Sequence, residues 1–316
     1  MDNSLLNKYE VGQSVEIIGV VESVRTGTTK KGDPYVELML TAKNERCRCI
    51  WWDKDNVEDL AHKPVKVQGT IKLYRDARNL WVDNIQVIRP TPEIMRQLVP
   101  SANSTEIEKL KKKLWSMIKT YITTQSLRQL LVTTFKRYLP DMANSPAASK
   151  IHDAYLGGLL RHTVAVASLA IQIAKEYPHL VNMELLITGA LLHDIGKVFA
   201  YQVDNLVIER SQDGILLEHI VMGLEIVNKI ISEHKIKIDE ETLKLIKHII
   251  ISHHGQLEWG SPVKPAIPEA IIVHYADVID SRISIVEHEL SDMKAGEIKF
   301  NKYVGYVLKV NEDSVE

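Results

Sequence analysis

The sequence predicts a multidomain α+β protein in which a small N-terminal β-barrel precedes an all-α domain. Apolar and polar residues alternate with a period of two through residues 14–90, as expected for strands with one buried face. From residue 106 to about residue 290 the apolar residues recur instead at helical spacing, as at Leu110 and Leu114. The two regions are separated by Pro90, Pro92 and Pro100.

The alternating region contains five short strands. The first begins at Val15, and the others cover residues 35–40, 46–52, 65–68 and 80–88. Turn residues separate them at 31–34 and 43–45, and residues 53–61 predict a short helix between the third and fourth strands. Three strands, a helix and two more strands in fewer than 90 residues resemble an OB-fold barrel.

The helical region begins after a run of capping residues at 101–105. Thr105, with Glu108 three residues later, predicts a capping box at the start of the first helix. A non-helical excursion at 201–213 predicts a small hairpin. We therefore expect an OB-fold nucleic-acid-binding domain at 1–90, a Pro-containing linker and basic helical connector at 91–150, and a helical domain with a C-terminal tail at 151–316.

Composition excludes several classes of protein. The 316 residues include 39 basic and 41 acidic side chains, so the net charge of −2 implies no global attraction to polyanions. No run approaches the roughly 18 apolar residues of a membrane span, and the first ten residues lack the pattern of a secretory signal. Because Cys47 and Cys49 are too close to form a structural disulfide, we expect a cytoplasmic protein with no membrane partner.

Charge is distributed unevenly along the chain. Residues 1–90 carry 14 basic and 13 acidic residues, residues 91–150 carry 10 and 4, and residues 151–316 carry 15 and 24. The net charges are therefore +1, +6 and −9. A basic connector beside a barrel suits a polyanion, whereas an acidic helical domain suits a cation; solvated helix faces are the alternative.

Histidine and aspartate residues in the helical domain form an ordered set at the ends of apolar runs. Burying an ionisable group without a partner is costly, and a shared cation would supply that partner. Imidazole and carboxylate together suit Mn²⁺, Fe²⁺ or Zn²⁺, and seven candidate ligands exceed the needs of one ion. The set is His162, His193, Asp194, His219, His253, His254 and Asp277.

The segment Leu191-Leu192-His193-Asp194-Ile195-Gly196-Lys197 is similar to the signature of the HD superfamily of metal-dependent phosphohydrolases. The resemblance implies that His162, His193, Asp194 and Asp277 hold one ion. It also implies that Asp194 bridges to a second ion held by His219, His253 and His254. Residues 151–316 would then be an HD-type phosphohydrolase domain, with Asp194 and Lys197 as its catalytic residues.

Three other charged residues lie close to these ligands in the sequence. Lys197 could reach a phosphate oxygen, or it could be a favourable cation at a helix C-terminus beside Gly196. Asp280 and Arg282 follow Asp277 by about one helical turn and could orient ligands or bind phosphate. An intrahelical ion network is the alternative for that pair.

One face of the barrel mixes aromatic and basic side chains. OB-folds bind single strands on their second and third strands, where aromatic rings stack on bases and cations follow the backbone. A solvated face whose aromatic residues serve β propensity is the alternative. The candidate contacts are Tyr35, Arg46, Arg48 and Trp52, extended by Lys30 and Lys31 in the first hairpin and by Tyr74, Arg75 and Arg78 in the last.

An OB-fold, a basic connector and an HD domain in this order resemble the YhaM family of bacterial 3′-to-5′ exoribonucleases. That resemblance implies Mn²⁺-dependent removal of 5′-mononucleotides from single-stranded RNA, with single-stranded DNA as a further candidate substrate. It leaves the oligomeric state open, so a homo-oligomer is compatible with it.

Two alternatives remain at this point. A cyclic-dinucleotide phosphodiesterase of the HD-GYP type shares the His-Asp segment and the double histidine. The sequence after His254, however, reads Gly-Gln-Leu-Glu-Trp-Gly-Ser-Pro and lacks the Gly-Tyr-Pro element. A non-catalytic nucleic-acid-binding regulator is the other alternative, against which the complete ligand set argues.

Overall fold

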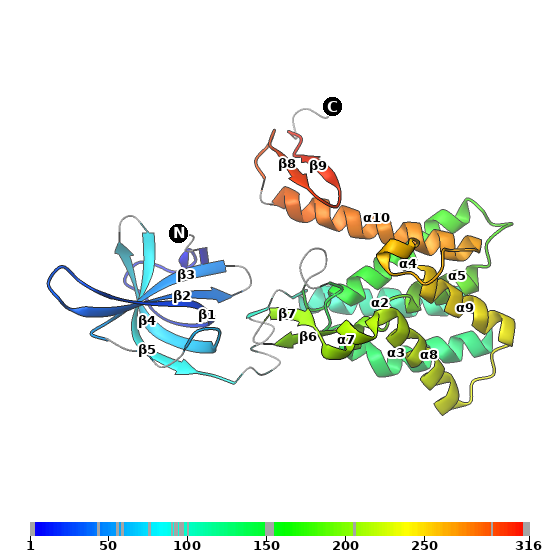
Figure 1. Ribbon diagram of the computed structural model, residues 1–316, viewed down its shortest axis with the longest axis horizontal. Coiled ribbons are helices and arrows are strands. Elements are labelled where there is room, and N and C mark those ends of the chain that lie inside the picture. Colours follow the sequence, from blue (N-terminus) through cyan, green and yellow to red (C-terminus); the bar gives the residue numbers. More distant parts are fainter. Residues whose placement is uncertain are drawn as a thin grey trace. The chain divides into compact units, whose positions relative to one another are not determined.

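The computed structural model describes residues 4–42, 45–54, 57, 60–74, 77–89, 91, 94, 98–99, 101–148, 155–204, 207–291 and 293–311 (Figure 1). The chain divides into two compact units. One comprises Met1–Ser101 and Val203–Val207, and the other comprises Ala102–Gln202 and Ile208–Glu316. Arg75, Pro90, Pro92 and Pro100 lie outside the described residues, and so do parts of the predicted segments at 43–45, 53–61 and 201–213.

The first unit contains the five predicted strands as a closed barrel. Its strand order is β1-β2-β3-β5-β4, with β4 pairing back to β1, and β3 and β5 form the one parallel pair among the described strands. This is the order of an OB-fold, and Figure 1 shows the strands curving around one another. The strands are β1 (Ser14–Thr28), β2 (Pro34–Ala42), β3 (Glu45–Trp52), β4 (Pro64–Tyr74) and β5 (Ala77–Val87), preceded by the turn η1 (Ser4–Leu6).

Alternation along the strands fills the barrel. Val36, Leu38 and Leu40 are fully buried on β2, and Cys47 and Cys49 are fully buried on β3 as free thiols. A bulge between Gln68 and Gly69 lets β4 turn sharply against β5. A Cβ at Gly69 would lie 2.2 Å from the backbone oxygen of Trp81, so this close approach requires glycine.

The short helix expected at 53–61 is not present in the described part of that segment. Asp53, Lys54, Val57, Leu60 and Ala61 are all non-helical. Asp53 adopts a left-handed conformation with φ of 57° directly after β3, which ends the strand in a turn rather than beginning a helix. Polar and apolar spacing alone does not distinguish such a turn from one helical turn.

The second unit is a helical bundle built around α5. Every residue from Leu185 to Leu192 is buried, so α5 packs against neighbours on all sides. The elements that follow the barrel along the chain are α2 (Ser104–Tyr121), α3 (Gln125–Met142), α4 (Gly158–Lys175), α5 (Met183–Leu192), α6 (Lys197–Ala200), β6 (Tyr201–Asp204), β7 (Val207–Arg210), α7 (Gln212–Leu216), α8 (Glu218–His234), α9 (Glu240–Ser252), η2 (Leu257–Trp259), α10 (Pro268–Ser291), β8 (Ile298–Asn301) and β9 (Gly305–Leu308) (Figure 1).

The basic connector contributes helices α2 and α3 to this same core. Leu114 of α2 and Phe135 of α3 share one apolar cluster with Leu159 of α4 and Leu191 of α5. The predicted capping box is wrong in its residues. Asn103 is the N-cap, its side chain accepting a hydrogen bond from the backbone N–H of Glu106 at 2.8 Å, and α2 already begins at Ser104.

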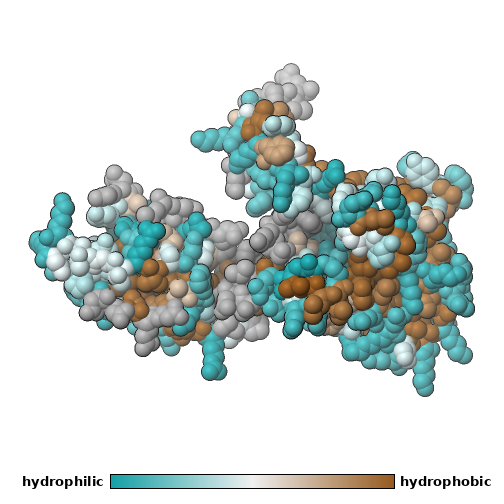
Figure 2. All heavy atoms as spheres, in the orientation of Figure 1, coloured by the Kyte–Doolittle hydropathy of each residue, from teal (hydrophilic) through white to brown (hydrophobic). Residues whose placement is uncertain are grey.

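The excursion at 201–213 forms the expected hairpin, β6–β7. A second hairpin, β8–β9, follows α10 and carries the exposed aromatic residues of the C-terminal segment. Figure 2 shows apolar side chains gathered on this hairpin and over α7. Among the described residues, no helix is both long and apolar enough to cross a membrane.

Candidate functional site

The fold brings all seven predicted ligands to one centre in the helical unit. His162 lies in α4, Asp277 lies in α10, and the other five follow α5 or α9 or begin α8. Two groups of side chains each place their ligand atoms within 4.8 Å of one another. The first group is His162, His193 and Asp277, and the second is His219, His253 and His254.

Asp194 lies between the two groups. Its Oδ2 atom is 3.3 Å from Nε2 of both His162 and His193, whereas its Oδ1 atom is 3.4 Å from Nε2 of His219 and 3.5 Å from Nε2 of His253. The side chain is 1% exposed, so both oxygens are buried among these rings. Two buried carboxylate oxygens that face separate imidazole sets are the arrangement of a bridging ligand.

The other ring nitrogen of each histidine is held by an oxygen. A carbonyl or an ionised carboxylate can only accept, so Nδ1 carries the proton and Nε2 keeps its lone pair in the neutral ring. In their neutral forms, the five rings therefore present Nε2 lone pairs to the centre. The Nδ1 donors and their acceptors are His162 to Asp280 at 2.6 Å, His193 to Ala190 O at 2.8 Å, His219 to Glu218 at 2.7 Å, His253 to Ile250 O at 2.7 Å, and His254 to Trp259 O at 2.7 Å.

Among the groups that support the ligands, the sequence analysis missed Arg161, Glu218 and every backbone carbonyl. Arg161 donates to both oxygens of Asp280, at 3.0 and 2.7 Å, and thereby fixes the carboxylate that holds His162. Glu218 adopts a left-handed φ of 65°, which turns its carboxylate back onto the His219 ring. The carbonyl of Trp259 holds His254. Adjacency to a ligand was the only sequence signal for Arg161 and Glu218.

Lys197 is buried beside Asp194. Its Nζ lies 2.7 Å from Asp194 Oδ2, and its side chain is 10% exposed. Lys197 is the first residue of the four-residue helix α6, whose single turn is also its last. Gly196 permits this placement because a Cβ there would lie 2.0 Å from the backbone oxygen of His219.

Charges in the centre are strongly coupled. Burial acts to raise the pKa of Asp194, but Lys197 and the neighbouring histidines lower it well below its usual value. Burial and the other histidines lower the pKa of His254 to about 3. Burial also acts to lower the pKa of His162, but Asp194, Asp277 and Asp280 raise it well above its usual value. This excess of carboxylate around His162 is charge that a cation would neutralise.

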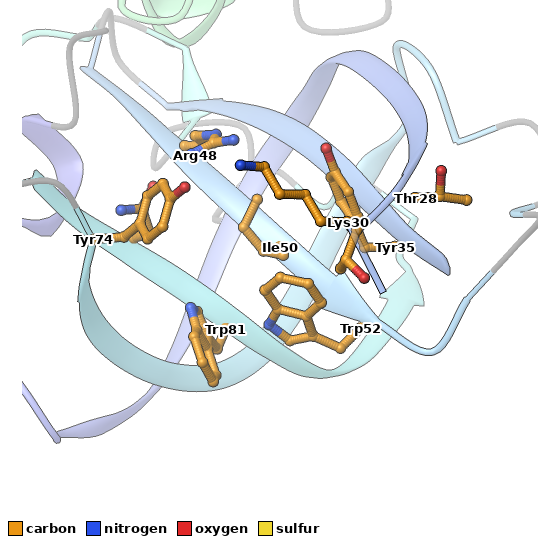
Figure 3. A pocket seen from close by; sticks show the side chains of 10 residues that line it. Thr28, Lys30, Tyr35, Arg48, Ile50, Trp52, Tyr74 and Trp81 are labelled. Carbon is orange, nitrogen blue, oxygen red and sulfur yellow. The ribbon is translucent and has the colours of Figure 1, made fainter. Parts of the chain in front are cut away.

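The barrel carries a separate pocket of about 400 Å³ (Figure 3). The ring centroids of Tyr35 and Trp52 are 5.5 Å apart, as are those of Trp52 and Trp81. The Arg48 guanidinium lies 6.0 Å from the Tyr74 ring centroid and pairs with Glu37 at 2.5 Å. Figure 3 shows the aromatic rings and the Lys30 and Arg48 side chains around one hollow.

Not all predicted contacts line this pocket. Lys30, Tyr35, Arg48 and Trp52 line it, and so does the buried Ile50. Arg46 pairs instead with Glu22 at 2.8 Å, and Lys31 and Arg78 are not lining residues. Arg75 lies outside the described residues. Tyr74, which was expected to extend the groove, lines the pocket, and Asn79 and Trp81 line it but were missed.

Two family models match parts of the chain. The model of the HD domain family matches residues 159–282, and a family described as a putative helicase matches residues 98–204. Among solved structures, a replication protein A domain from Methanococcus maripaludis is 19% identical and covers 27% of this chain and 92% of its own, with a TM-score of 0.24.

Curated relatives match almost the whole chain. The 3′-5′ exoribonuclease YhaM of Listeria innocua is 30% identical over 304 residues, which are 94% of each chain. The Listeria welshimeri protein of the same name is 31% identical over 94% of each chain, and that of Bacillus subtilis is 30% identical over 92% of this chain and 91% of its own. Full-length similarity, the HD domain and the barrel together show that this chain belongs to the YhaM family of 3′-5′ exoribonucleases.

Proposed function

We propose that this protein is a divalent-metal-dependent 3′-5′ exoribonuclease that hydrolyses single-stranded RNA to 5′-mononucleotides, with single-stranded DNA as a second substrate. The observation that carries the proposal is the position of Asp194, with each carboxylate oxygen within 3.5 Å of a different pair of imidazole Nε2 atoms. Family membership supplies the direction of degradation.

The donor set fits two metal ions. His162, His193, Asp194 and Asp277 would hold one ion, and Asp194 with His219, His253 and His254 would hold the other. Nitrogen and carboxylate oxygen donors suit Mn²⁺, which we propose as the ion. Two bound ions would lower the pKa of a water molecule and neutralise charge on the attacking and leaving oxygens at phosphorus.

The reaction adds one water to each terminal linkage. The oxygen of water bonds to phosphorus, and the bond from phosphorus to the penultimate O3′ breaks. The released nucleotide keeps the phosphate on its 5′ oxygen, and the shortened strand takes up a proton at its new 3′ hydroxyl.

The protein's own charged groups support this reaction. Lys197 holds a buried ammonium beside Asp194, and Asp194 raises the Lys197 pKa although burial acts to lower it, so the side chain stays charged. From this position the ammonium can offset charge on a non-bridging phosphate oxygen. Asp280 and Glu218 hold the rings of His162 and His219 in one orientation.

We propose that the barrel holds the strand. Tyr35, Trp52 and Trp81 supply ring faces for bases, and Lys30 and Arg48 supply positive charge in the same pocket. Arg46, Lys31 and Arg78 would contact backbone phosphates around this pocket, and Arg75, which lies outside the described residues, stays a predicted phosphate contact. In this division of labour, residues 1–90 bind, residues 91–150 connect and contribute positive charge, and residues 151–316 cleave.

The test uses purified full-length protein and a 5′-labelled single-stranded RNA. With Mn²⁺ we expect a ladder of progressively shorter labelled strands and release of 5′-mononucleotides, and we expect EDTA to stop both. Asp194→Ala should remove the activity and leave RNA binding intact, because it deletes the bridging carboxylate and leaves the barrel unchanged. Shortening that survives EDTA, or full activity in Asp194→Ala with excess Mn²⁺, would overturn the proposal.

A further inference from the structure

A pocket of about 440 Å³ lies beside the metal ligands within the helical unit. Its lining includes His254 and Asp277 from the centre, Trp259 from η2, Arg282 from α10, and Lys302 and Tyr303 from the turn of the β8–β9 hairpin. The volume lies within the range of about 300–1,000 Å³ that is typical of small-molecule sites. The C-terminal hairpin therefore forms one wall of a cavity whose other wall is the centre itself.

The hairpin turn is held in place by defined contacts. The backbone N–H of Tyr303 donates to the Asn301 side chain at 2.8 Å, and Gly305 takes the positive φ of 83° that closes the turn. Asn301 also donates to Glu289 of α10 at 2.8 Å, and Lys309 Nζ donates to the carbonyl of Leu290 at 2.9 Å. Both strands are thus fastened to the helix that carries Asp277.

The chemistry of the pocket combines aromatic faces with positive charge. Trp259 is 51% exposed and Tyr303 is 45% exposed, although both line the cavity. In the part of the chain that the structure describes, neither Arg282 nor Lys302 pairs with a carboxylate, and Lys302 Nζ lies 4.7 Å from the Tyr303 ring centroid. An aromatic base with an attached phosphate matches this combination, whereas a purely apolar ligand would leave both cations unused.

We infer that this pocket seats the 3′-terminal nucleotide of the substrate, with its base against Tyr303 and its phosphate beside Arg282 and Lys302. The inference rests on the proposed exonuclease function and adds the place where the departing nucleotide binds. A seat bounded by the centre and by the hairpin turn accommodates a strand end. Arg282 of α10 and Tyr303 of the segment after α10 would then bind the nucleotide.

The test compares how adenosine 5′-monophosphate and inorganic phosphate inhibit RNA hydrolysis by the full-length protein with Mn²⁺. Loss of one base stack, worth about 1–3 kcal/mol, corresponds to an inhibition constant that is about 5- to 150-fold larger. Tyr303→Ala should weaken inhibition by the nucleotide by this factor and leave inhibition by phosphate unchanged. Tyr303→Phe, which keeps the ring, should behave as the parent protein. Arg282→Ala should weaken inhibition by both ligands.

Tyr306→Ala is the matched control, because Tyr306 is in the same hairpin, is 79% exposed and does not line the pocket. It should leave both inhibition constants unchanged. If Tyr303→Ala stays within twofold of the parent for the nucleotide, or if Tyr306→Ala weakens it equally, the inference is wrong.

Failure of the proposed function gives a different result. In that case the parent protein itself does not shorten RNA. Binding of adenosine 5′-monophosphate is then measured by calorimetry on a Trp52→Ala background, which removes stacking in the barrel pocket. If Tyr303→Ala weakens this binding by about 5- to 150-fold, the inferred nucleotide site is supported. If Tyr303→Ala leaves the affinity unchanged, the inference is overturned.

Discussion

Lys197 is the residue whose role the geometry constrains most narrowly. A buried ammonium 2.7 Å from Asp194 either stabilises the fold through that ion pair or acts on the substrate. Lys197→Ala should lower turnover by about 10² to 10³, the cost of deleting one preorganised charge-stabilising group, while the metal content stays unchanged. Single-turnover kinetics with metal analysis would measure both quantities.

The control for this prediction is Lys244→Ala, since Lys244 is an exposed residue of α9 that pairs only with Glu241 among the described residues. It should retain full turnover. A Lys197→Ala protein with normal turnover and a lowered melting temperature would show that the ion pair is structural only.

At the residue scale, the sequence predicted the candidate ligands better than their supports. His193 and His253 end buried apolar helices, and the His-Asp segment is a continuous motif, so both signals are local. The contact from Arg161 to Asp280 instead joins residues 119 positions apart. Only the packing of α4 against α10 brings that pair together, so no local pattern could reveal it.

The junction between α2 and α3 depends on one carboxylate at the start of α5. Glu184 accepts hydrogen bonds from the backbone N–H of Thr123 at 2.9 Å and of Thr124 at 3.1 Å, and from the Thr123 hydroxyl. Partial burial acts to raise the pKa of Glu184, but these hydrogen bonds lower it below its usual value. The ionised form is thus the one that the folded protein stabilises.

Because the folded pKa of Glu184 is lowered, its contribution is present above the unfolded pKa and is lost as pH falls through the folded pKa. Glu184→Gln should lower the free energy of unfolding by about 1 kcal/mol at pH 7, and by less in acid. Urea denaturation at several pH values would measure this. The control is Glu108→Gln, at an exposed ion pair within α2, which should change the free energy of unfolding little. If Glu184→Gln lowers the free energy of unfolding equally at pH 7 and in acid, the stabilising role of the ionised Glu184 is contradicted.

The aromatic row of the barrel gives the second prediction at the scale of elements. Trp52→Ala should weaken binding of single-stranded RNA by about 1–3 kcal/mol, because it removes the ring between Tyr35 and Trp81. Fluorescence anisotropy with labelled RNA would measure the affinity. Val87→Ala is the matched control, since Val87 is a half-exposed β5 residue outside the pocket. Equal affinities of the two variants would exclude stacking at Trp52.

Strand alternation explains why part of this pocket was predicted and part was missed. Tyr35, Arg48 and Trp52 share one face of adjacent antiparallel strands, which a period of two can indicate. Trp81 reaches the pocket because β5 pairs in parallel with β3 in the register Ile50 to Trp81. That register is set by closure of the barrel and leaves no mark on either strand alone.

For the whole molecule, the charge distribution predicts a separation of binding from cleavage. Residues 1–90 and 91–150 carry net charges of +1 and +6, whereas residues 151–316 carry −9. A fragment that begins near Ser101 keeps every candidate ligand and the core of the helical unit. It should hydrolyse a very short oligonucleotide or an activated phosphodiester, but should bind long RNA more weakly than the full chain.

The fragment's loss of RNA affinity relative to the full chain should be largest at low salt, because phosphate neutralisation by Lys and Arg contributes less to binding as salt rises. A salt titration of RNA affinity for the fragment and the full chain would measure it. If the fragment binds and degrades a long single strand as well as the full chain does at every salt concentration, the barrel does not hold substrate. An assembly or regulatory role for residues 1–90 would then be the better explanation.

The most direct test of the two-ion centre is a crystal structure of the full-length protein with Mn²⁺, with anomalous scattering recorded at the manganese edge. We expect two anomalous peaks, one on each side of Asp194, at roughly the 2.0–2.2 Å distance of metal–nitrogen bonds. One should contact Nε2 of His162 and His193, and the other Nε2 of His219, His253 and His254. If every peak held by Asp194 lies more than about 6 Å, three times a metal–nitrogen bond, from His219 or from His254, the bridge at Asp194 is contradicted.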